Sequence, residues 1–151
     1  MRRPPTTPRV RESAPPAYEV RTAPEPVWLS RALVDYLHDT SLAMFGGLPA
    51  ANNENLVESA LARPQNLFVY VGGDLPRLAA AYAFGFAKNR GYRDGNKRTA
   101  FTSCATFLDL NGLELVVDEA EALERMLELA TDAISEEGFA EWLRAHVVPR
   151  G

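Results

Sequence analysis

"LPRLAAAYAFGFAKNRGYRDGNKRTAF", residues 75–101, is the stretch that decides the fold. Its first part is apolar nearly all round at helical spacing, and a helix of that kind runs through the centre of a core. Asp74 stands before it as an N-cap. A polar loop, residues 90–95, follows, and a second central helix begins near Asn96 and ends at Gly112. We therefore expect two buried helices joined by an exposed loop.

The flanking sequence predicts further helices. "WLSRALVDYLHDTSLAMF", residues 28–45, has helical apolar spacing after Ser30 and stops at two glycines. A shorter helix is expected at about Glu54–Ala62, ended by the proline at position 64. Two more follow the second central helix, and each begins at a capping residue, at Asp118 with Glu121 three positions on, and at Ser135.

Two segments read as extended chain. "NLFVYVGGD", residues 66–74, is β-branched and aromatic before a glycine pair, which predicts a small strand or hairpin. "LELVV", residues 113–117, predicts a short extended piece. Together the elements predict an all-α domain with one small β element between its second and third helices.

Length and composition place the chain among ordinary globular proteins. With 151 residues, 46% of them hydrophobic, it is long enough for one self-sufficient domain. Residues 1–26 hold seven prolines and predict a flexible arm, which leaves residues 27–148 as the domain. A single cysteine, Cys104, and no long apolar run favour a cytoplasmic protein without a membrane span. The net charge of −4 does not suggest general nucleic-acid binding.

The loop "DGNKR", residues 94–98, has the parts of a phosphate site. Gly95 and Asn96 at a helix start leave backbone N–H groups open, and the helix dipole adds positive potential. Lys97 and Arg98 bring charge, and Asp94 could hold Mg²⁺. The other interpretation is a plain turn, an N-cap and a solvated first helical turn, and the pentapeptide alone does not decide between them.

The wider context resembles the Fic/Doc (Fido) family, whose motif is roughly His-x-Phe-x-Asp/Glu-Gly/Ala-Asn-Gly/Lys-Arg. The form with Lys97 is similar to its death-on-curing branch, toxins of bacterial toxin–antitoxin pairs. The resemblance runs from about Trp28 to Val147 and includes four further segments: "FGGLPA" (45–50), "ESALARPQNLFVY" (58–70), "AAAYAFGFAKN" (79–89) and "TFLDLNG" (106–112). It implies a Fido-type helical bundle with a β-hairpin flap beside the active loop.

Carried over by position, the resemblance implies a role for each motif residue. Asp94 would be the metal ligand, and Gly95 with Asn96 the anion nest. Lys97 and Arg98 would contact nucleotide phosphates, so that ATP and Mg²⁺ are the implied cofactors. The flap that aligns a target by strand-like pairing would be Asn66, Leu67, Phe68, Val69 and Tyr70.

Arg90 departs from the motif, because the family's catalytic histidine falls on this position. That histidine takes a proton from the attacking hydroxyl, whereas a guanidinium stays protonated and has no acceptor lone pair. Three explanations are open: a native histidine changed so that a toxin could be produced, a natural pseudoenzyme that binds without turnover, or a clamp in other chemistry. Of the two histidines in the chain, His38 is expected to be structural and His146 to lie at a helix end.

The resemblance implies a toxin that phosphorylates a translation protein such as elongation factor Tu. Transfer of AMP instead of phosphate is the alternative enzyme reaction, and a catalytically dead nucleotide- or partner-binding protein is the alternative of another class. "AISEEG", residues 133–138, lacks the first residue of the family's self-inhibiting helix. An external antitoxin with a flexible segment that folds on binding is therefore the expected partner.

Overall fold

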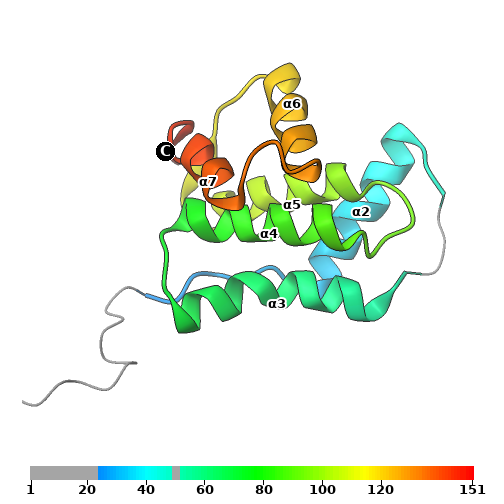
Figure 1. Ribbon diagram of the computed structural model, residues 1–151, viewed down its shortest axis with the longest axis horizontal. Coiled ribbons are helices and arrows are strands. Elements are labelled where there is room, and N and C mark those ends of the chain that lie inside the picture. Colours follow the sequence, from blue (N-terminus) through cyan, green and yellow to red (C-terminus); the bar gives the residue numbers. More distant parts are fainter. Residues whose placement is uncertain (1–23, 49–51) are drawn as a thin grey trace, which may run out of the picture.

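The computed structural model describes residues 24–48 and 52–151, and it consists mostly of helices (Figure 1). The helices are α2 (Arg31–Phe45), α3 (Glu54–Tyr70), α4 (Leu75–Asn89), α5 (Asn96–Leu110), α6 (Glu119–Ala130) and α7 (Glu136–Arg144). Two short strands, β1 (Leu113–Leu115) and β2 (Val147–Pro149), pair with each other. The predicted all-α class is confirmed.

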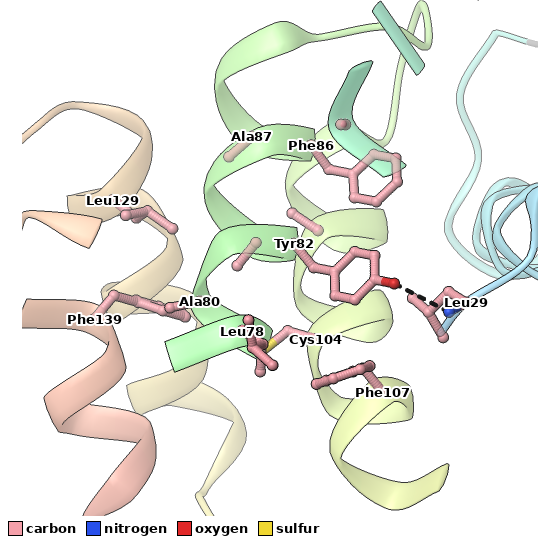
Figure 2. Close-up of a cluster of buried hydrophobic side chains, with 14 of the residues drawn as sticks. Leu29, Leu78, Ala80, Tyr82, Phe86, Ala87, Cys104, Phe107, Leu129 and Phe139 are labelled. Atoms are coloured by element: carbon pink, nitrogen blue, oxygen red, sulfur yellow. Dashed lines mark hydrogen bonds between the residues drawn. The ribbon is translucent and has the colours of Figure 1, made fainter. Parts of the chain in front are cut away.

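Helix α4 is the centre of the molecule, as its apolar composition predicts. It contacts α3, α5, α6 and α7, and Figure 1 shows the other helices arranged around it. Tyr82 and Phe86 of α4 lie in one buried cluster with Phe107 of α5 and Phe139 of α7 (Figure 2). The Tyr82 hydroxyl accepts a hydrogen bond from the backbone N–H of Leu29 at 3.0 Å, and burial raises the pKa of Tyr82 to about 12.

The helix starts follow the predicted caps. The side chain of Asp74 accepts from the N–H of Arg77 at α4, and Asp118 and Ser135 do the same at α6 and α7. Ser30 caps α2 in the same way, by accepting from Leu33. Each cap satisfies a backbone donor that has no partner inside the helix. These local signals fixed four of the six helix starts.

The β element predicted at residues 66–70 is wrong. The chain continues there as α3, which runs through Pro64 and ends at Tyr70 before the glycine pair. Pro64 lacks an N–H, so the carbonyl of Ala60 loses its helical partner. Gly85 of α4 packs at this point, where a Cβ would lie 3.4 Å from the Ala60 oxygen. The predicted end of this helix near Ala62 is therefore also wrong, because burial of the proline face outweighs one missing bond.

The strand pair joins segments far apart in sequence. The extended piece predicted at residues 113–117 begins with β1, and it pairs antiparallel with β2 near the C-terminus. Leu113 lies opposite Pro149 and Leu115 opposite Val147. The partner strand was not predicted, since it is short and its sequence has no alternating pattern.

The start of the described chain is held against the helices. Val27 exchanges two hydrogen bonds with the side chain of Asn111, and Trp28 stacks on Phe107 with ring centroids 5.8 Å apart. Leu29 is buried. Of the predicted arm, residues 1–23 lie outside the described residues, and the division at residues 26 and 27 stays a prediction.

Candidate phosphate site on the loop between α4 and α5

The loop of residues 90–95 joins the two central helices and lies against the start of α3. Arg90 closes α4 in the left-handed conformation, with φ 54° and ψ 48°. The carbonyl of Gly91 accepts from the N–H of Asn53 at 2.8 Å, and the Asn89 amide donates to the Leu56 carbonyl at 3.0 Å. These bonds fix the loop on the N-terminal turn of α3.

Gly91 has no room for a side chain. A Cβ on this residue would lie 2.7 Å from Cγ2 of Val57 and 2.9 Å from its backbone N. Real Cβ atoms do not approach other atoms so closely. The family motif accepts any residue at this position, but in this chain the packing against α3 requires glycine.

Asn96 holds the loop from within. Its side-chain oxygen accepts from the N–H of Tyr92 at 3.1 Å, and its amide donates to the Tyr92 carbonyl at 2.7 Å. Asn96 is buried, so both bonds are shielded from water. The Asn96 side chain therefore fixes the loop conformation, and an anion at this helix start would bind to backbone N–H groups and not to the Asn96 amide.

The N-terminus of α5 is open. Gly95, with φ 78°, stands at the N-cap and supplies no side-chain bond. The first helical hydrogen bond at this end runs from the N–H of Thr99 to the Gly95 carbonyl. Among the described residues nothing accepts from the N–H groups of Asn96, Lys97 or Arg98. Three aligned donors at the positive end of a helix dipole are an arrangement that favours an anion.

Asp94 lies beside this open end and is half-buried. Its Oδ2 accepts from the N–H of Leu48 at 3.0 Å, while its Oδ1 makes no hydrogen bond within the described chain. The backbone carbonyl of Asp94 accepts from Nε2 of His38 at 2.7 Å. One carboxylate oxygen thus orders the connection after α2, and the other remains available to a cation.

His38 of α2 supports the loop through a hydrogen bond and a ring contact. Because a carbonyl can only accept, Nε2 carries the proton in the bond to Asp94. The imidazole ring stacks on Tyr92 with centroids 3.9 Å apart, and it is buried. The structural role expected for His38 is confirmed, although its partner is the loop itself and the Asp39 carboxylate lies farther away, at 3.7 Å.

Tyr92 takes the place of the motif phenylalanine and packs under the loop, as predicted. The ring is buried, and its hydroxyl donates to Asp35 at 2.9 Å. Burial, followed by the Asp35 hydrogen bond, raises the pKa of Tyr92. Asp35 in turn pairs with Arg31, which also holds Glu54 at the start of α3. This network ties α2, α3 and the loop together.

Arg98 is turned toward α2. Its Nε donates to Ser41 at 2.8 Å and its Nη2 to the Gly46 carbonyl at 3.1 Å, with the guanidinium over the ring of Phe45. These contacts brace the chain segment that carries Leu48 to Asp94. Only the remaining nitrogen of the fork is without a bond in the described chain.

A pocket of about 310 Å³ opens over the loop and the start of α5. Its charged lining is Lys88, Arg90, Arg93, Lys97 and Asp94. The remaining wall includes Ala130, at the end of α6. Four cations and one carboxylate make the pocket basic, although the whole chain carries a net charge of −4. The predicted residues Arg90, Asp94, Gly95, Asn96 and Lys97 all line it.

The residues predicted as the flap lie elsewhere. Asn66 to Tyr70 form the last turns of α3, while the first turn of α3 contacts the loop. A helix of 17 residues spans about 25 Å, so these residues stand at the far end from the pocket. Asn66, Leu67 and Tyr70 line a second hollow beside Glu136 of α7. Residues 46–48 lie beside the loop, as does the first turn of α3.

The other candidate groups lie away from the loop. His146, at the end of α7, contacts the Trp142 carbonyl at 2.7 Å through Nδ1. Cys104 is fully buried in α5, and burial raises the pKa of its thiol. A buried, protonated thiol is a poor nucleophile, so Cys104 is a core residue.

The family model described as "Fic/DOC family" matches residues 28–108, more than half of the chain and the whole loop. The chain belongs to the Fic/Doc family. Its relatives include "Protein kinase doc" of Escherichia phage P1, 34% identical over 72% of this chain and 86% of that protein. "Toxin Doc" of Mycolicibacterium smegmatis is 42% identical over 70% of this chain and 89% of that protein. This Fic/Doc chain thus has relatives named as a kinase and as a toxin.

The described residues fit a nucleotide with its metal only in part. Within residues 24–48 and 52–151, no three metal-binding side chains lie together, and Asp94 is the one carboxylate that lines the pocket. One carboxylate is typical of Mg²⁺ sites in which phosphate oxygens and water complete the shell. In the same ranges no helix of this Fic/Doc chain has the length and apolar character needed to cross a membrane.

Proposed function

We propose that this Fic/Doc site is built to transfer a phosphate from ATP to a hydroxyl of a translation protein similar to elongation factor Tu. The observation that carries the proposal is the open N-terminus of α5 inside a basic pocket, with Asp94 at its side. A relative named as a protein kinase supports phosphoryl transfer as the reaction. In the chain as it stands, Arg90 silences the transfer.

The residues of the pocket have separate tasks in this proposal. ATP would supply the phosphoryl group, and Mg²⁺ would neutralise its charge. The free oxygen of Asp94 would bind the metal, and the N–H groups at the start of α5 would hold phosphate oxygens. Lys97 adds a positive charge at the same helix end, while Arg98 holds α2 in place and offers one nitrogen.

Arg90 removes the general base. The residue lies in the pocket, but a guanidinium cannot accept the proton of an attacking hydroxyl. General-base catalysis contributes ~10²–10⁴-fold, so its loss leaves little activity. A natural protein that binds nucleotide without turnover is the second candidate function, and Arg90 is the observation that favours it. A chain in which a native histidine was replaced would look the same.

The biological setting follows from the proposed activity. A relative named as a toxin supports a role in growth arrest. Such a protein would act in the cytoplasm on its protein target, without binding nucleic acid or membrane. It would be restrained by an antitoxin whose flexible segment folds on binding.

Replacing Arg90 by histidine tests the proposal. Arg90→His should label a translation factor from γ-labelled ATP and Mg²⁺ at least about a hundredfold more than the parent chain, because a proton acceptor returns to the pocket. The measurement is autoradiography of a bacterial translation extract, followed by mass spectrometry of the labelled band. Expression of Arg90→His without antitoxin should arrest bacterial growth.

Two controls separate the outcomes. Arg90→Gln removes the charge without supplying a base, and Arg90→His with Asp94→Asn removes the metal carboxylate, so neither should label. Label from α-labelled ATP would assign AMP transfer. Absence of label from either nucleotide, in a folded Arg90→His protein that binds ATP, would establish the non-catalytic binding protein.

A further inference from the structure

The pocket contains the only two arginines in the described chain that have no partner. All other arginines in residues 24–48 and 52–151 make a hydrogen bond or ion pair: Arg31, Arg63, Arg77, Arg98, Arg125, Arg144 and Arg150. Arg90 and Arg93 make none, and both line the pocket. Both are also exposed.

The two lysines of the pocket differ in their partners. Lys88 is paired with the Asp132 carboxylate at 2.8 Å and also donates to the Ala130 carbonyl at 3.3 Å. Lys97 has no partner among the described residues and lies at the start of α5. Three unpaired cations therefore line the pocket into which the open start of α5 leads. No carboxylate of the described chain pairs with these cations, and Asp94 already accepts from Leu48.

The chemistry of this arrangement specifies a ligand with several negative charges. A guanidinium pairs with phosphate through two parallel hydrogen bonds, and a lysine adds a point charge. One carboxylate or one phosphate would occupy only part of these donors. A polyphosphate chain, free or as part of a nucleotide, could engage both arginines and the helix end together. Because the chain as a whole is acidic, attraction of such an anion must come from this local patch.

We propose that Arg90 and Arg93 form a polyphosphate clamp. Arg90 then raises the affinity for polyphosphate at a position where a histidine would support turnover. This inference rests on the proposed function, since it assigns the same pocket to a nucleotide. In this chain Arg90, at the position of the family's catalytic histidine, binds phosphate. The protein then holds a nucleoside triphosphate more tightly than its Arg90→His counterpart and does not consume it.

Calorimetry with the full chain tests the clamp. The probes are inorganic tripolyphosphate, a non-hydrolysable ATP analogue and adenosine, each titrated into the parent, Arg90→Gln, Arg93→Gln and the double variant. A charge-assisted bond corresponds to about a tenfold change, so each single variant should bind the two phosphate probes about tenfold more weakly. The double variant should lose more, and the dependence of affinity on salt should become less steep. Adenosine should bind none of the proteins measurably.

Matched variants make the result specific. Arg125→Gln changes an arginine of α6 that is paired with Glu128 and lies outside the pocket, so binding should equal that of the parent. If Arg90→Gln and Arg93→Gln both bind tripolyphosphate as the parent does, the clamp is wrong. A loss seen only with Lys97→Gln would then leave phosphate at the helix start and the proposed function intact. A parent chain that binds neither phosphate probe also overturns the clamp, and the labelling by Arg90→His decides the proposed function separately.

Discussion

Arg90 occupies a backbone conformation that also suits histidine. With φ 54° it lies in the left-handed region, where non-glycine residues are uncommon and histidine is several-fold enriched. Arg90→His therefore needs no change of the loop backbone. A failure of that variant to label a target would concern the chemistry of the pocket and not its folding.

Gly91 provides a stability prediction next to the same site. Gly91→Ala should lower the free energy of unfolding by roughly 1–3 kcal/mol, because the new methyl group meets the backbone of Val57 and forces the loop from α3. Urea denaturation followed by circular dichroism measures the change. Arg93→Ala is the control in the same loop, since that side chain is exposed and unpaired in the described chain. Equal stability of the Gly91→Ala protein and the parent would contradict the contact.

At the scale of elements, Asp74 connects the start of α4 with the end of α7. It caps α4 through Arg77 and forms a two-bond pair with Arg144, at 2.7 and 2.9 Å. The Arg144 hydrogen bond is the first cause of the lowered pKa of Asp74. A carboxyl with a lowered pKa in the folded state stabilises the fold above its unfolded pKa of about 4, and this contribution is lost as the pH falls through the folded value.

Asp74→Asn tests this connection, because asparagine keeps the cap and removes the charge. The variant should be less stable than the parent near pH 7 by up to ~1 kcal/mol, as for other exposed pairs. The difference should shrink as the pH falls below the unfolded pKa of about 4 toward the folded pKa of Asp74. Urea denaturation of both proteins from about pH 7 to about pH 3 measures it. A difference that is as large at about pH 3 as at about pH 7 would mean that the amide damages the cap.

Most elements could be predicted because their determinants are local. Asp74, Asp118 and Ser135 each act within four residues, and the loop from Arg90 to Arg98 is contiguous. Residues 66–70 could not be read correctly, since their β-branched and aromatic composition competes with burial of α3 against α4. Local propensity is weaker than such packing.

The contacts that support the pocket from other helices could not be predicted from the sequence pattern. His38 and Leu48 contact Asp94 across about fifty positions of chain, and nothing in their own neighbourhood marks them. Arg98, for which a phosphate contact stays a prediction, also donates to Ser41 and to the Gly46 carbonyl, and nothing in the motif indicates those two bonds. Contacts of this kind depend on how helices are placed, which a motif does not encode.

At the scale of the whole molecule, the residues just before α2, Trp28 and Leu29, contribute to the core. A protein that begins at residue 24 should be as stable as the full chain, within about 0.5 kcal/mol, since all described contacts remain. One that begins at Ser30 should lose at least about 2 kcal/mol, because Trp28 and Leu29 leave the core. Urea denaturation of the three proteins compares them. Marked destabilisation of the protein that begins at residue 24 would show that residues 1–23 contribute to the fold.

Both ends of the described domain meet at one turn. Val27 is bound to Asn111, and the N–H of Arg150 donates to the Gly112 carbonyl at 2.9 Å. The pocket lies at the other end of α5, about 22 Å away for a helix of 15 residues. A fusion partner or surface tether attached at either end would therefore leave the pocket uncovered. Joining the two ends by a short linker, with new termini elsewhere, would give a circularly permuted protein with the same pocket.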